Sequence, residues 1–152
     1  MKRNKKSIGT LKNKFLNTLM SNGKKNTTEK ILLSSAKRIY KLKSINFKCS
    51  FKLALINATP LFKLNEQLVK KGKRKIKKQV PFFLAGEYNR LMQGLKIIKS
   101  TSKRIRKSNT FYNSVSSELI NLMEEKSIVL ANNNEIKNQV ISNKRHLSKF
   151  RW

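Results

Sequence analysis

The spacing of apolar residues near the start of the chain predicts two helices joined by a tight turn. Apolar side chains recur at intervals of three and four over residues 11–20. The Asn-Gly pair at 22–23 is a common helix terminator, because both residues tolerate the left-handed conformation. Asn26 and Glu29 have the spacing of a capping box, with Asn26 as the cap. They predict the start of a second helix that ends near Ser44.

A third helix is predicted over about 46–57, and Pro60 directs the chain into an extended exit. Beyond it the apolar period changes from 3.6 to 2, which is typical of strands. The apolar residues fall on even positions in both halves of this segment: Phe62, Leu64, Leu68, Ile76, Val80, Phe82 and Leu84. The pattern predicts a β-hairpin arm over 61–84 whose two strands share one apolar face, with Lys71-Gly72 near its tip.

Helical spacing returns after the arm and predicts a fourth and a fifth helix. The fourth carries apolar side chains from Tyr88 to Ile98, with Gly94 as a weak point that costs about 1 kcal/mol relative to alanine. The fifth has an apolar stripe over 111–123. Three of the chain's carboxylates are expected to lie away from that stripe: Glu118, Glu124 and Glu125.

A last helix is predicted where Asn132 and Glu135 repeat the capping-box spacing. The fold class is therefore mainly α, a bundle of about six helices with a protruding two-stranded β-hairpin arm between the third and fourth helices. The 152 residues are expected to form one domain, residues 1–152. Residues 1–10 are expected to form a basic N-terminal arm.

The charge of the chain predicts a polyanionic partner. It has 36 Lys and Arg against 7 acids, a formal charge of +29, and this self-repulsion opposes compaction unless counter-charge is supplied. The charge is densest at 70–78, KKGKRKIKK, with seven bases in nine positions. Nucleic acid is the expected partner. No membrane partner is expected, because no apolar run approaches the roughly 18 residues of a spanning helix.

The sequence offers little material for catalysis or metal binding. There is no aspartate, Cys49 is the only cysteine and His146 the only histidine. A zinc tetrad would need further ligands of these types, and no nucleophile, cofactor loop or metal cluster is marked. We therefore expect a protein that is not an enzyme, with no cofactor, no metal and no small-molecule substrate.

Several segments together resemble the small-subunit ribosomal protein seven family. They are KFLNTLMSNGKKNTTEKIL (14–32), FKLALINATPLFKL (51–64), QVP (79–81) and SELINLMEEKSIVLANNNEIKNQVISNKRHLSKFRW (117–152). The resemblance runs from about Lys14 to Trp152 and rests on the order and spacing of the segments. The family's usual Gly-Gly pair and Tyr at the arm are missing, and Ile128 stands where the family has a Gly between the last two helices.

The resemblance implies a structural constituent of the small ribosomal subunit. Such a protein binds the 3′ major domain of small-subunit rRNA, nucleates head assembly and borders the exit tRNA site. Its implied partners are small-subunit rRNA, neighbouring head proteins and exit-site tRNA. The basic helices joined by short turns would also suit a chromatin-like DNA-binding protein, which is the alternative function.

The residues expected to bind rRNA are bases in exposed arms, turns and helix ends, where they would meet phosphates, together with a terminal aromatic that would stack on a nucleotide. They are Lys2, Arg3, Lys5, Lys6, Lys24, Lys25, Lys70, Lys71, Lys73, Arg74, Lys75, Lys77, Lys78, Arg104, Arg106, Lys107, Lys144, Arg145, Arg151 and Trp152.

Composition also bears on the compartment. Lys, Asn and Ile are abundant, as expected of an AT-rich gene, and about thirteen residues precede the first family-like segment. That is too short for a substantial transit peptide in addition to the family's own N-terminal arm. We expect an organelle-encoded protein of the mitochondrial small ribosomal subunit, with plastid or bacterial cytoplasm as alternatives.

Overall fold

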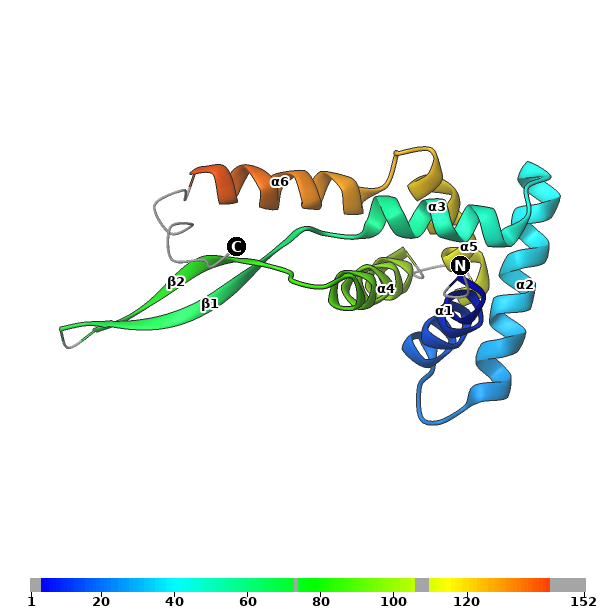
Figure 1. Ribbon diagram of the computed structural model, residues 1–152, viewed down its shortest axis with the longest axis horizontal. Helices are drawn as coiled ribbons and strands as arrows, with labels where there is room; N and C mark the ends of the chain where they lie inside the picture. The colour runs from blue at the N-terminus through cyan, green and yellow to red at the C-terminus, as the bar shows by residue number, and fades with distance from the viewer. Residues whose placement is uncertain (1–3, 73, 106–109, 143–152) are drawn as a thin grey trace.

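A computed structural model describes residues 4–72, 74–105 and 110–142. These residues form six helices and one antiparallel hairpin (Figure 1). In chain order they are α1 (Asn4–Leu19), α2 (Lys25–Lys43), α3 (Phe47–Ala58), β1 (Phe62–Lys71), β2 (Arg74–Phe83), α4 (Glu87–Ile105), α5 (Phe111–Met123) and α6 (Ile128–Ser142). The mainly α class is confirmed, as is the place of the arm between the third and fourth helices.

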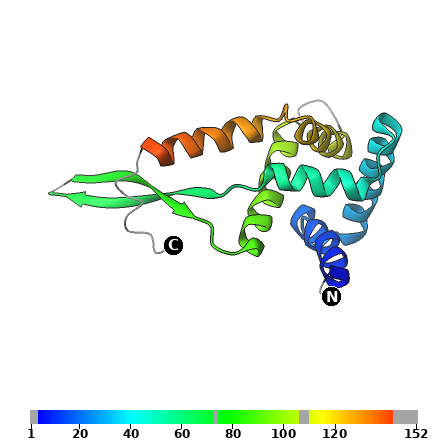
Figure 2. The same cartoon turned by 45° about the horizontal axis from the view of Figure 1, so that its top comes forward.

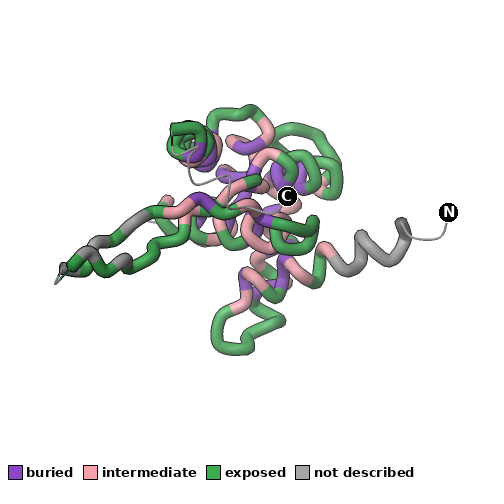
Figure 3. Tube along the Cα trace, turned by 60° about the vertical axis from the view of Figure 1, so that its left-hand side comes forward, coloured by how far each residue is buried: buried purple, intermediate pink, exposed green. Residues whose placement is uncertain are grey.

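Helix α5 lies at the centre of the helical body, where it contacts α2, α3 and α4. Its Val115, Leu119 and Leu122 side chains are completely buried. Fully burying one such side chain contributes about 1.5–3 kcal/mol, so the stripe predicted on this helix organises the core. Figure 3 shows that buried positions gather in the helical body, while the arm is largely exposed.

The first helix begins earlier than predicted, since α1 starts at Asn4 and not at residue 11, and residues 4–10 of the expected basic N-terminal arm are helical. Residues 1–3 lie outside the described residues. The segment from 4 to 10 contains no proline that could stop the helix, and Gly9 alone costs only about 1 kcal/mol relative to alanine. The helix that starts in the apolar part therefore continues backwards through the basic residues.

The start of α2 differs from the predicted capping box over 26–29. The helix begins at Lys25, and Lys24 holds the cap position without a side-chain cap bond. Gly23, with φ of 70°, turns the chain so that its carbonyl accepts a hydrogen bond from the Lys25 N–H at 2.8 Å. The Thr28 hydroxyl donates to the Lys24 carbonyl at 2.9 Å. This local turn starts the helix before the Asn-Glu pair is reached.

The junction from α2 through α3 agrees with the sequence. Ser44 ends α2 in the left-handed conformation with φ of 54°. Asn46 caps α3, and its side chain accepts a hydrogen bond from the Lys48 N–H at 3.1 Å. Thr59 is extended ahead of Pro60, as the restriction on residues before proline requires. The predicted end of the second helix and the predicted bounds of the third are confirmed to within one residue.

The start of α6 and the position of Glu118 both differ from expectation. Ser127, not Asn132, caps α6, and its Oγ accepts a hydrogen bond from the Val129 N–H at 3.1 Å. The same hydroxyl donates to Glu118 Oε1 at 2.6 Å. Glu118 is thus buried and does not lie on an exposed acidic surface, because its carboxylate turns inward to the Ser127 hydroxyl. Glu124 and Glu125 are exposed as predicted.

The hairpin has a different register from the one expected. Phe62 pairs with Phe83 and Lys71 with Arg74, so every even position of β1 faces an odd position of β2. The even-numbered apolar residues of the two strands therefore lie on opposite faces, and the predicted common apolar face is wrong. The cause is the spacing of the strands along the chain, because only two residues separate the paired Lys71 and Arg74, and this fixes an odd register sum. Gly72 has φ of 63° there.

The root of the arm is anchored against α6. Figures 1 and 2 show α6 running beside the arm, and α6 contacts β1. Pro81 and Val140 are buried, and the Phe62 and Phe83 rings pack edge to face with centroids 5.8 Å apart. Two strands alone are marginally stable, so the helix and the aromatic pair hold the root.

Among the described helices, none is long and apolar enough to cross a bilayer.

Gly94 is a point of close approach between α3 and α4. A Cβ placed on it would lie 3.1 Å from Thr59 Cγ2 and 3.3 Å from Leu55 Cδ1. Both neighbours belong to the end of α3 and its cap. The helix therefore accepts the low propensity of glycine because α3 leaves no room for a side chain.

Gly94→Val should lower the free energy of unfolding by about 2 kcal/mol, because inserting side-chain volume into a packed contact costs about 1–3 kcal/mol. Urea denaturation followed by circular dichroism measures this change. The control is Lys96→Val, which places the same residue type at an exposed position of the same helix. Equal losses for the two variants would show that the α3 contact does not matter.

Candidate nucleic-acid interface

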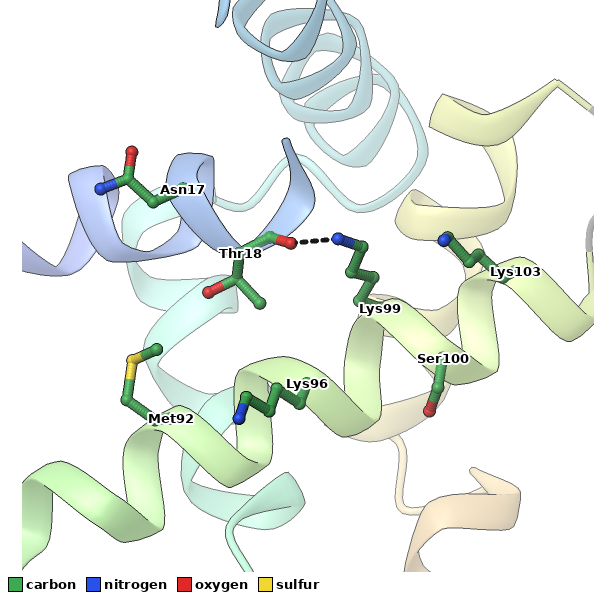
Figure 4. Close-up of a pocket in the computed structure, with 7 residues that line it drawn as sticks. All are labelled: Asn17, Thr18, Met92, Lys96, Lys99, Ser100 and Lys103. Atoms are coloured by element: carbon green, nitrogen blue, oxygen red, sulfur yellow. Dashed lines mark hydrogen bonds between the residues drawn. The ribbon is translucent and has the colours of Figure 1, made fainter. Parts of the chain in front are cut away.

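A row of lysines runs along one side of α4. Lys96, Lys99 and Lys103 follow one another at spacings of three and four, which places them on one helix face. Together with Asn17 and Thr18 of α1 they line a pocket of about 420 Å³ (Figure 4). None of the described residues that line this pocket carries a carboxylate. It is therefore a concave basic site suited to an anion.

Lys99 fixes α1 against α4. Its Nζ donates to the Thr18 carbonyl at 2.5 Å and to the Met20 carbonyl at 3.3 Å. These carbonyls lie at the C-terminal end of α1, where the helix dipole favours a cation. One partly buried basic side chain thus holds α1 and α4 together at the wall of the pocket.

The same position disfavours the protonated form of the Lys99 amino group. Burial, and after it the nearby charge of Lys103, lower the pKa of the Lys99 amino group. Because the folded pKa lies below the unfolded value, stability rises with pH between the two and is lowest where the group is fully charged. A bound anion would offset the repulsion and raise this pKa again.

Two further cations are oriented by aromatic rings. Lys14 Nζ lies 4.4 Å from the centroid of the Tyr88 ring, which joins α1 to the start of α4. The Arg90 guanidinium lies 4.9 Å from the Phe83 centroid, and its Nε donates to the Leu84 carbonyl at 2.9 Å. Arg90 therefore connects α4 to the root of the arm.

The arm carries charge that its own residues do not neutralise. Residues 61–84 contain eight bases and one acid, Glu66. Lys77 Nζ lies 4.0 Å from Glu66 Oε2, with both side chains mostly exposed, and such pairs contribute little. The remaining charge must be balanced by solvent ions or by a partner.

Glu124, at the end of α5, pairs with local lysines instead. Glu124 accepts from Lys43 Nζ at 2.5 Å and from Lys126 Nζ at 3.1 Å. Lys43 first, and then Lys126, lower the pKa of the Glu124 carboxyl. This cluster joins the ends of α2 and α5, and it includes none of the α4 lysines.

The structure places part of the predicted binding set. Lys24, the cap residue of α2, and Lys25, its first residue, are both exposed, a few residues beyond the Met20 carbonyl that Lys99 contacts. Arg104 is exposed in the last turn of α4, and Lys70, Lys75 and Lys77 are exposed on the arm. Five other bases are placed by their backbone alone, on α1 or on the strands: Lys5, Lys6, Lys71, Arg74 and Lys78.

The rest of the predicted set lies outside the described residues. It comprises Lys2, Arg3, Lys73, Arg106, Lys107, Lys144, Arg145, Arg151 and Trp152. The proposed stacking of Trp152 therefore stays a prediction.

The sequence-based set omitted the lysine row and the α1 residues that complete its pocket. The 96, 99, 103 spacing is itself a signal, because bases at three and four residues form a stripe as apolar residues do. Asn17 and Thr18 carried no such signal, since they join the pocket only through the packing of α1 on α4.

Replacing both Lys96 and Lys103 with Gln should weaken binding to a structured RNA and lower the slope of log K against log salt by nearly two units, because each lost phosphate contact removes about 0.9. Filter binding at several salt concentrations measures the slope. The control is Lys30→Gln with Lys37→Gln, two exposed lysines of α2 that change the net charge equally. Equal slopes for the two double variants would contradict a specific role for the row.

The sequence pattern of the family described as "Ribosomal protein S7p/S5e" matches residues 2–144. The chain is also similar to the "Small ribosomal subunit protein uS7" of Blochmanniella pennsylvanica (strain BPEN). The two are 30% identical over 139 residues, which cover 91% of this chain and 85% of the relative. The family match thus spans α1 to α6, the lysine row and the arm, and the chain belongs to the ribosomal protein S7p/S5e family.

Proposed function

We propose that the chain is a structural constituent of the small ribosomal subunit and acts as one rRNA-binding domain without catalytic activity. In this proposal it binds the 3′ major domain of the rRNA, nucleates head assembly and borders the exit tRNA site. The observation that carries the proposal is the concave pocket that three lysines of α4 line, in a chain that belongs to a ribosomal protein family.

The lysine row would bind phosphates and position the RNA. Lys96 and Lys103 are seven residues apart, which is about 10 Å along a helix, so the row has room for more than one phosphate. Phosphate contacts supply affinity and orientation but do not read the base sequence. Selectivity would come from the fit of a folded RNA junction to the concave surface between α1 and α4.

The arm would reach into RNA away from the helical body. Strands of ten residues extend about 33 Å at roughly 3.3 Å per residue. The register places Lys70, Lys75 and Lys77 on one face and the exposed Lys63 on the other. Bases on both faces suit a position between two RNA strands, and this is where exit-site tRNA and neighbouring head proteins become candidate partners.

We also propose that this small subunit is mitochondrial. The abundance of Lys, Asn and Ile supports an AT-rich organellar gene, and plastid or bacterial origin is the alternative. Recovery of the native protein from ribosomes of purified mitochondria would support this assignment, whereas recovery from cytosolic ribosomes alone would overturn it.

The native protein should sediment with the small ribosomal subunit. Its purified form should bind cognate rRNA with a salt slope of about −6 to −7 if roughly eight phosphates are neutralised. A slope shallower than about −2 would contradict the proposal that phosphate contacts supply most of the affinity. Preference for duplex DNA over structured rRNA at fixed salt would favour the chromatin-like alternative instead.

Deleting residues 70–78 and joining the strands through a short turn should leave the free energy of unfolding within about 1 kcal/mol, or slightly raise it, because the deletion relieves repulsion. The same variant should bind rRNA more weakly, with a salt slope flatter by several units. Thermal unfolding and filter binding measure the two effects. A large loss of stability with unchanged affinity would mean that the arm supports the fold and does not bind RNA.

A further inference from the structure

A second concave surface lies between α1, α2 and α3. It is a groove of about 400 Å³, and seven of the eleven residues that line it are apolar. Its floor is formed by the buried Phe15 and Phe51, whose ring centroids are 4.6 Å apart. None of its residues belongs to the pocket of the lysine row, so the two sites are separate.

The walls of the groove leave apolar surface in water. Leu33 of α2 is 60% exposed, and Leu11 and Phe47 are only half-buried. Single exposed apolar residues are ordinary, but a contiguous apolar patch that continues into a groove marks an interaction site. A groove formed by three helices is also suited to an amphipathic helix that inserts apolar side chains.

The surroundings of the groove are basic. Lys12, Lys48 and Lys52 line it, and within the described part of the chain no carboxylate does. The exposed Lys30 and Lys37 lie about one turn before and after Leu33 on α2. The groove is therefore complementary to a segment with apolar side chains on one face and carboxylates on the other.

We propose that this groove docks an acidic amphipathic segment of a neighbouring protein of the small subunit. The inference rests on the proposed function, because the partner is met within the assembled particle. An RNA backbone would contact the lysines but leave the apolar floor of the groove exposed to water.

Site-specific crosslinking in assembled subunits tests the proposal. A photoreactive benzoylphenylalanine replaces Leu33 in the full chain, and the control carries it at Leu42, a leucine of the same helix that is 57% exposed and lies outside the groove. Position 33 should give a protein adduct that maps to a segment rich in Asp and Glu. Position 42 should give little of that adduct.

Three outcomes in a chain that enters small subunits would overturn the inference but not the proposed function. They are a crosslink from position 33 to rRNA, equal crosslinks from both positions, and no crosslink at all. A chain that does not enter small subunits overturns the proposed function, and the inference falls with it. The two failures are distinguished by the sedimentation of the crosslinkable chain before irradiation.

A charge reversal separates docking from folding. Lys48→Glu should reduce the adduct from position 33 about tenfold, the effect of roughly 1.4 kcal/mol, while the exposed Lys41→Glu on α2 should not. Lys48 lies in the first turn of α3, where the helix dipole favours a carboxylate. Unfolding of α3 therefore does not explain a smaller adduct. Unchanged adduct in Lys48→Glu would exclude an acidic partner.

Discussion

Repulsion among 36 basic side chains in 152 residues is the constraint to which the rest of the structure responds. The described core consists of apolar stripes gathered around α5, and Glu118 is the buried carboxylate within it. The basic residues lie on outer helix faces, in turns and on the arm. Core burial holds the helices together, but nothing in the core offsets the charge of the arm and α4. A polyanion would stabilise the folded state by binding it in preference to the unfolded chain.

Lys99 connects this constraint to the architecture. Its amino group occupies the C-terminal end of α1, so a side chain that repels its neighbour Lys103 also fixes the wall of the pocket. The lowered pKa of Lys99 records the cost of burial and of that repulsion. A phosphate at this site would reduce the cost, which links anion binding to the stability of the α1–α4 contact.

Helix α1 contributes to both concave surfaces. Asn17 and Thr18 face the lysine row, whereas Leu11 and Phe15 line the apolar groove. One helix thus separates a site suited to RNA from a site suited to a protein segment. Because α1 is held to α4 by Lys99 and packs on α2, the relative position of the two surfaces is set by the same contacts. A neighbouring protein at the groove would meet a surface already ordered by the core.

Features that depend on a few consecutive residues could be predicted from the sequence alone. Apolar periodicity gave the number of helices and the place of the arm, Ser44 and Asn46 marked the junction of α2 and α3, and the dense bases of the arm and of Lys24-Lys25 marked candidate contacts. Tertiary structure alone decided which polar groups meet. Ser127 became the cap of α6 because Glu118 lies beside it. The pairing of Lys71 with Arg74 set the hairpin register. The pocket was completed by α1 residues that lie about 80 positions before the α4 lysines. Such contacts join residues far apart in the chain, and local propensity carries no information about which of them will become neighbours.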